Sequence, residues 1–64
     1  MTKHEKKALR QLIRQWRLNI EAGRILAKDC EQNGWNVAKT VADTVCDITA
    51  RHARQVAHIL RRAK

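Results

Sequence analysis

Basic side chains recur along the first half of the chain at a spacing that could bind a row of phosphates. Seven lysines and arginines follow a heptad that Glu21 interrupts, namely Lys3, Lys7, Arg10, Arg14, Arg17, Arg24 and Lys28. On a helix, this spacing places them on one face, over about 37 Å at 1.5 Å per residue. That length is close to one turn of a nucleic acid duplex, so we expect the row to follow a phosphate strand.

A second basic group lies near the C-terminus, at Arg51, Arg54, His58 and Arg61. Residues 1–17 and 50–64 together hold eleven lysines and arginines against one acid, whereas residues 18–49 hold three against five acids. A chain that folds back near its middle would bring both basic arms to one end. Ordinary solvated helix faces mix the two signs of charge, so arms almost free of acids favour a nucleic acid partner.

The remaining polar residues do not form a catalytic constellation. Serine is absent and the carboxylates are dispersed, while Cys30 and Cys46 are more typical of small buried residues than of nucleophiles. Cys46, His52 and His58 do not share a helix face, which argues against a zinc site. His52 falls within an apolar stripe, where a core histidine is the ordinary explanation. We therefore expect no enzyme activity, no cofactor and no metal.

The elements that position these residues are two helices, expected at about residues 3–32 and 36–62, with a turn at 33–35. The composition favours helix and contains no proline. Gly34 can adopt a positive φ and end the first helix in a Schellman motif, with Trp35 packing back toward Cys30. Asn36 is then a plausible N-cap for the second helix. Residues 1–64 make a single domain.

Two apolar stripes predict that these helices pack against each other. The first helix carries a 4-3-4-3 seam of Leu9, Ile13, Trp16, Ile20, Gly23, Ala27 and Cys30. The second carries Ala38, Val41, Ala42, Val45, Ile48, Val56, Ile59, Leu60 and Ala63. Two such stripes joined by a short turn specify an all-α fold, an antiparallel αα-hairpin.

A further apolar group, Leu18, Ala22 and Ile25, lies roughly opposite the seam of the first helix. In a lone hairpin these residues would face water, so their clustering indicates a second interface. A chain of 64 residues has a marginal core, and association is an expected remedy. A homodimer that forms a four-helix bundle would cover this group, and so would a docked partner protein.

The chain shows no signal for a membrane or for secretion. It has no apolar run of about 18 residues, its N-terminus is basic without an apolar core, and two cysteines are too few for a disulfide scaffold. We expect a cytoplasmic protein without a membrane partner.

The N-terminus resembles that of a known family. Met1, Thr2, Lys3, Glu5, Lys6, Ala8 and Leu9 are similar to the start of the Rop (Rom) family, the RNA-binding copy-number regulators of colicin plasmids. The resemblance implies an antiparallel homodimer of αα-hairpins that binds paired RNA hairpins through its first helices, and Lys3 is the RNA-contacting position carried over. The chain departs from the family at Arg14, where the family has phenylalanine, and in its strongly basic charge.

Two functions remain open from the sequence. The first is a small regulator of plasmid or phage type that binds structured RNA or duplex DNA through the basic face of the first helix. The alternative is a small plasmid- or phage-type inhibitor or adaptor that docks on a larger nucleic-acid-handling host protein. Its basic face would then meet an acidic surface, and the group at Leu18, Ala22 and Ile25 would be its apolar anchor.

Overall fold

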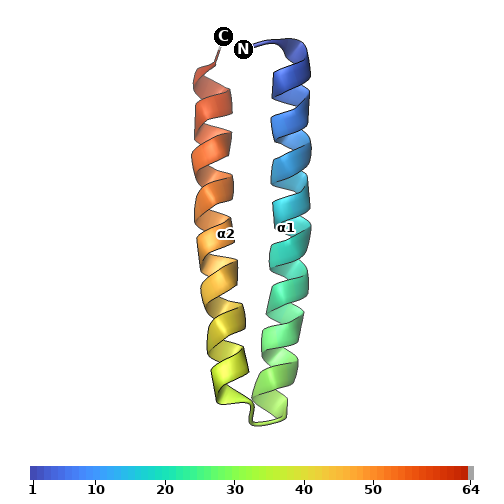
Figure 1. Ribbon diagram of the computed structural model, residues 1–64, viewed down its shortest axis with the longest axis vertical. Coiled ribbons are helices and arrows are strands. Elements are labelled where there is room, and N and C mark those ends of the chain that lie inside the picture. Colours follow the sequence, from blue (N-terminus) through green and yellow to red (C-terminus); the bar gives the residue numbers. More distant parts are fainter. Residues whose placement is uncertain (64) are drawn as a thin grey trace.

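The computed structural model describes residues 1–63 as two antiparallel helices joined by a tight turn (Figure 1). Helix α1 spans Lys3–Gln32 and helix α2 spans Asn36–Arg62. The Cα atoms extend over 48 × 14 × 11 Å, so the hairpin is a thin rod with both chain ends at the same end (Figure 1). The expected all-α class and helical hairpin are confirmed.

A capping box starts α1. The Thr2 hydroxyl accepts a hydrogen bond from the Glu5 backbone N–H at 3.1 Å, and the Thr2 backbone N–H donates to the Glu5 carboxylate at 3.0 Å. Two backbone donors that a helix start would leave unpaired are thereby satisfied. The bond from the Thr2 backbone, followed by that with its hydroxyl, lowers the pKa of the Glu5 carboxyl.

The turn is the Schellman motif expected at Gly34, whose φ is 72°. The Trp35 N–H donates to the Cys30 carbonyl at 2.8 Å, and the Gly34 N–H donates to the Glu31 carbonyl at 3.2 Å. The expected N-cap at Asn36 is wrong, because Trp35 is the N-cap residue and makes no side-chain capping bond. Trp35 also stays 59% exposed rather than packing its ring down on the helix end.

The contact between the helices follows the expected seam on α1. All seven predicted residues of α1, from Leu9 to Cys30, are buried or half-buried. On α2 the prediction is only partly right. The buried or half-buried residues at heptad spacing are Lys39, Ala42, Cys46, Thr49, Ala53, Val56, Leu60 and Ala63. Five residues predicted to face α1 are instead exposed, namely Ala38, Val41, Val45, Ile48 and Ile59.

Close approach of the helices explains this rotation of α2. A Cβ atom placed on Gly23 would lie 2.5 Å from the Cys46 Sγ, and that thiol also lies 3.6 Å from the Ile20 carbonyl oxygen. At such a separation the residues of α2 nearest this point must be small, as Ala42 is. Val41, Val45 and Ile48 are therefore turned outward.

Candidate nucleic-acid interface

Four arginines, two from each helix, border one groove of the hairpin. Arg10 and Arg17 come from α1, and Arg54 and Arg61 come from α2. We call this the arginine groove; its volume is about 750 Å³. Its floor consists of aliphatic side chains that are all buried or half-buried, namely Ile13, Ile20, Ala50, Ala53, Ala57 and Leu60. The three alanines of α2 are short, which leaves room between the arginines.

The length of the arginine groove suits a short stretch of one nucleic acid strand. On each helix the two arginines are seven residues apart, or about 10 Å along the axis. Because the helices are antiparallel, Arg10 and Arg61 lie nearer the termini, and Arg17 and Arg54 nearer the middle. At a rise of about 3.4 Å per nucleotide, 10 Å corresponds to about three nucleotide steps.

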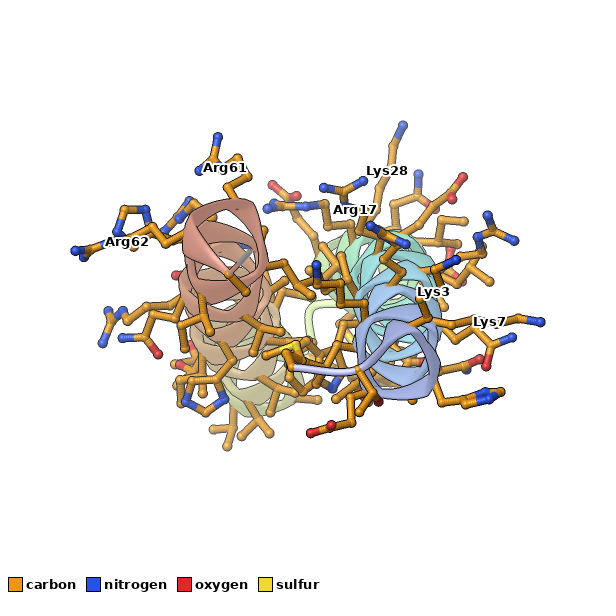
Figure 2. All side chains as sticks on the ribbon, turned by 90° about the horizontal axis from the view of Figure 1, so that it is seen from above. Lys3, Lys7, Arg17, Lys28, Arg61 and Arg62 are labelled. Atoms are coloured by element: carbon orange, nitrogen blue, oxygen red, sulfur yellow. The ribbon has the colours of Figure 1, made fainter. Side chains whose placement is uncertain are left out.

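The basic surface continues from this groove along α1. Arg14 borders an adjoining depression together with Arg10 and Arg17. Figure 2, which looks along the helices from the open end, shows Arg17, Lys28 and Arg61 reaching toward the same side of the hairpin. This side is therefore the basic face that the heptad of α1 indicates, and the arginines of α2 contribute to it.

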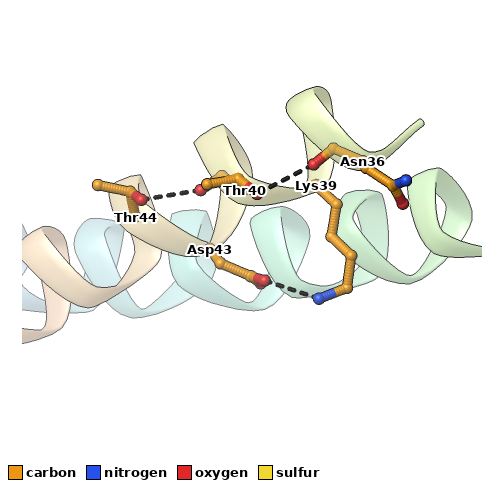
Figure 3. A network of polar contacts seen from close by, with 5 residues as sticks. All are labelled: Asn36, Lys39, Thr40, Asp43 and Thr44. Atoms are coloured by element: carbon orange, nitrogen blue, oxygen red, sulfur yellow. Dashed lines mark hydrogen bonds and ion pairs between the residues drawn. The ribbon is translucent and has the colours of Figure 1, made fainter.

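Toward the turn, acidic residues interrupt the basic surface. Arg24 and Lys28 share a depression with Glu31, Lys39 and Asp43. Figure 3 shows Lys39 paired with Asp43 at 3.0 Å, an ion pair within α2. The contact raises the pKa of Lys39, chiefly through the hydrogen bond to the carboxylate. The purely basic part of the face is thus the half nearer the termini.

Not all predicted basic residues lie at the arginine groove. Lys3 is one heptad before Arg10 and shares its side of α1. Lys7 and Arg62 point outward, away from the contact between the helices (Figure 2). Arg51 is exposed and does not border the groove. Lys64, counted in the basic C-terminal arm, lies outside the described residues.

Among residues 1–63, the groove arginines have no intramolecular counter-ion. The ion pair in this range is Lys39–Asp43, and no acidic side chain of the range borders the arginine groove. Four uncompensated guanidinium groups on a thin rod repel one another, and a bound polyanion would relieve this repulsion.

The opposite face of the hairpin is apolar. It carries a second groove of about 450 Å³, bordered chiefly by aliphatic side chains, among which Leu26, Val41 and Val45 are 56–57% exposed. Leu26 follows Arg17 by nine residues and Val45 precedes Arg54 by nine, which is about two and a half turns of helix. On both helices, therefore, the apolar face points away from the arginine groove.

The predicted interface at Leu18, Ala22 and Ile25 is exposed, as a second interface would require in a single hairpin. It stays a prediction. It is confined to α1, whereas the apolar face defined by Leu26, Val41 and Val45 spans both helices.

His52 is not the core residue expected from its stripe. It is exposed at the margin of the helix contact, and its ring centroid lies 6.4 Å from that of Trp16, with the rings tilted by 51°. The reason is again the rotation of α2, which places Ala53 rather than His52 in the contact.

Comparisons with protein-family models, curated proteins and solved structures find no match. Within residues 1–63, neither helix contains an apolar stretch that could cross a bilayer. In the same range, histidine, cysteine and acidic side chains form no group of three or more that could hold a metal ion.

Proposed function

We propose that the protein is a small regulator that binds the backbone of structured RNA or duplex DNA through the arginine groove, and that it acts as a homodimer. The observation that carries this proposal is the convergence of four arginines, from both helices, on one groove where residues 1–63 offer them no acidic partner. Arginine suits phosphate because its planar guanidinium can donate two hydrogen bonds to one group.

The floor of the groove favours nucleic acid over a protein partner. A docked protein needs large apolar anchors in contact with a pocket, and those are the residues that dominate protein interfaces. Here the aliphatic floor is buried or half-buried in the packing of α1 on α2, and the large exposed apolar residues lie elsewhere. Binding in this groove would draw mainly on charge, as contacts to phosphate do.

The exposed area of the chain supports the homodimer. A compact monomer of 7.4 kDa exposes about 4,200 Å² by the usual scaling of surface with mass. The hairpin exposes 5338 Å², an excess of about 1,100 Å². Two chains that each covered this excess would bury about 2,200 Å², which is in the range of obligate homodimers. The apolar face around Leu26, Val41 and Val45 is the surface suited to it.

Such a dimer would be a four-helix bundle made of two stacked hairpins. It is the architecture that the resemblance to the Rop family implies. Packing the two apolar faces together would give the small core a second layer, since only Ile13, Ala27, Cys30, Cys46 and Ala53 are buried apolar residues in residues 1–63 of one chain.

The salt dependence of binding tests the proposal. Fluorescence anisotropy with a labelled 20-base-pair RNA or DNA duplex would be recorded over a range of salt. The double variant Arg54→Gln with Arg61→Gln should lower the slope of log K against log salt by about two units, since each phosphate contact contributes about 0.9. The control, Arg51→Gln with Arg62→Gln, removes the same charge from α2 outside the groove and should change the slope little.

Two results would contradict the proposal. Equal losses in the two double variants would show that the charge of α2 acts without the groove. No salt-dependent affinity of the unmodified protein for either duplex would rule out the nucleic-acid function and favour the inhibitor or adaptor.

A further inference from the structure

The two functional faces of one hairpin point in opposite directions. Arg17 and Leu26 on α1, and Arg54 and Val45 on α2, are each separated by about two and a half helical turns. The rod is only 11–14 Å across, measured over its Cα atoms, so the arginine groove and the apolar face are the two broad sides of a single layer of helices.

A dimer closed through the apolar faces must then carry its arginine grooves on the outside. In a two-fold dimer the same patch of both chains meets, and each chain turns its other broad side to solvent. The grooves lie on the outside whichever direction the two-fold axis takes within the plane between the two hairpins. With two layers of helices, each about 10 Å thick, the grooves lie about 20 Å apart and face away from each other.

One straight duplex cannot occupy both grooves. A duplex lying in one groove touches one outer side of the bundle, and the bundle itself separates it from the other groove. The second groove is therefore left free for another strand, with an identical set of four arginines.

From this arrangement we infer that the dimer is a bridge, which holds two separate segments of nucleic acid on its opposite sides. The inference rests on the proposed function, because it requires both the backbone contact and the dimer. Its consequence is a raised effective concentration of one segment near the other.

A two-duplex capture assay tests the bridge with the full chain. One 20-base-pair RNA duplex is fixed to beads, a second duplex of the same sequence carries a fluorophore, and retention of the fluorophore is measured as protein is added. A bridge predicts maximal retention near one dimer per two duplexes. It also predicts a fall in retention at excess protein, because each duplex then binds its own dimer.

Matched variants distinguish bridging of two duplexes from binding of a single duplex. Leu26→Asp with Val45→Asp should give a monomer that still shifts the anisotropy of one duplex but retains none on the beads. The control, Thr40→Asp with Thr44→Asp, changes the charge by the same amount at exposed residues of α2 that border neither groove, and should keep retention. Helix content by circular dichroism verifies that each variant is folded. If a variant does not fold, the titration curve of the unmodified protein still shows whether the dimer bridges two duplexes.

Different results overturn different statements. Binding of one duplex per dimer, without retention at any ratio, overturns the bridge and leaves the proposed function standing. Retention that rises without a maximum, or that survives in the monomeric variant, also overturns the bridge, because it indicates aggregation driven by charge. Absence of any duplex binding overturns the proposed function itself.

Discussion

Replacing Gly23 by alanine should destabilise the hairpin, although alanine is the better helix former. Helix propensity alone favours alanine by about 0.8–1.0 kcal/mol. The added Cβ, however, would lie 2.5 Å from the Cys46 Sγ, about 1 Å inside ordinary contact distance. Cys46 is only 3% exposed, so its thiol has little free space to enter. Overpacking of this kind costs about 1–3 kcal/mol, which leaves a net loss of about 0–2 kcal/mol.

A variant without the Cys46 thiol should reverse the sign of the effect of Gly23→Ala. In the background Cys46→Ala the Sγ is gone, so Gly23→Ala should stabilise the protein by about 1 kcal/mol. The effect of the same substitution should therefore differ by about 1–3 kcal/mol between the two backgrounds, which is the coupling a double-mutant cycle measures. Urea unfolding followed by circular dichroism, at one fixed protein concentration, gives all four free energies of unfolding.

The other glycine supplies the control. Gly34 has a φ of 72° and nothing within 4 Å of a Cβ placed on it, so Gly34→Ala should cost about 1–2 kcal/mol through backbone strain alone. That cost should be the same with and without Cys46. The reasoning fails if Gly23→Ala stabilises both backgrounds equally, because the helices would then have room for the methyl group.

Three more outcomes are expected. Arg10→Gln with Arg17→Gln should lower the salt slope of duplex binding by about two units, as much as the double variant of Arg54 and Arg61 on α2. A much larger loss of slope than that of the α2 variant would show that α1 binds alone. Val45→Asp should convert the proposed dimer to a monomer in sedimentation and lower the melting temperature, whereas Leu18→Asp should do neither. The reverse result would place the dimer interface at Leu18, Ala22 and Ile25. The carboxylate of Glu5 should stabilise α1 above its ordinary pKa of 4.5, and this contribution should fade as pH falls through its lowered pKa. Acid unfolding of Glu5→Gln should accordingly differ from the unmodified protein near neutral pH and converge with it at low pH.

The sequence alone predicts those parts of the fold that depend on local signals, namely the turn and the seam of α1. Gly34 indicated the turn because few other residues tolerate a positive φ, and the seam of α1 followed from its unbroken heptad. The rotation of α2 could not be predicted, because apolar residues cover a broad arc of that helix. The close approach of the helices at Gly23 and Cys46 requires small residues there, and it is compatible with Val45 and its neighbours facing outward.

The same ambiguity limited the prediction of the site. The basic row of α1 was visible as a heptad, but whether Arg54 and Arg61 would lie across from it depended on the rotation of α2. One readable signal was not used. Thr2 and Glu5 stand at the spacing of a capping box, which sequence alone could have assigned to the start of α1.

The shared location of the two chain ends has a practical consequence for anyone who labels this protein. A tag or fluorophore at this end would lie near Arg61, where its own charge or bulk would compete with a strand bound as proposed (Figure 1). The turn at 33–35 is at the far end of a 48 Å rod and leaves both broad sides clear. A dye attached there would report on assembly and binding without taking part in either.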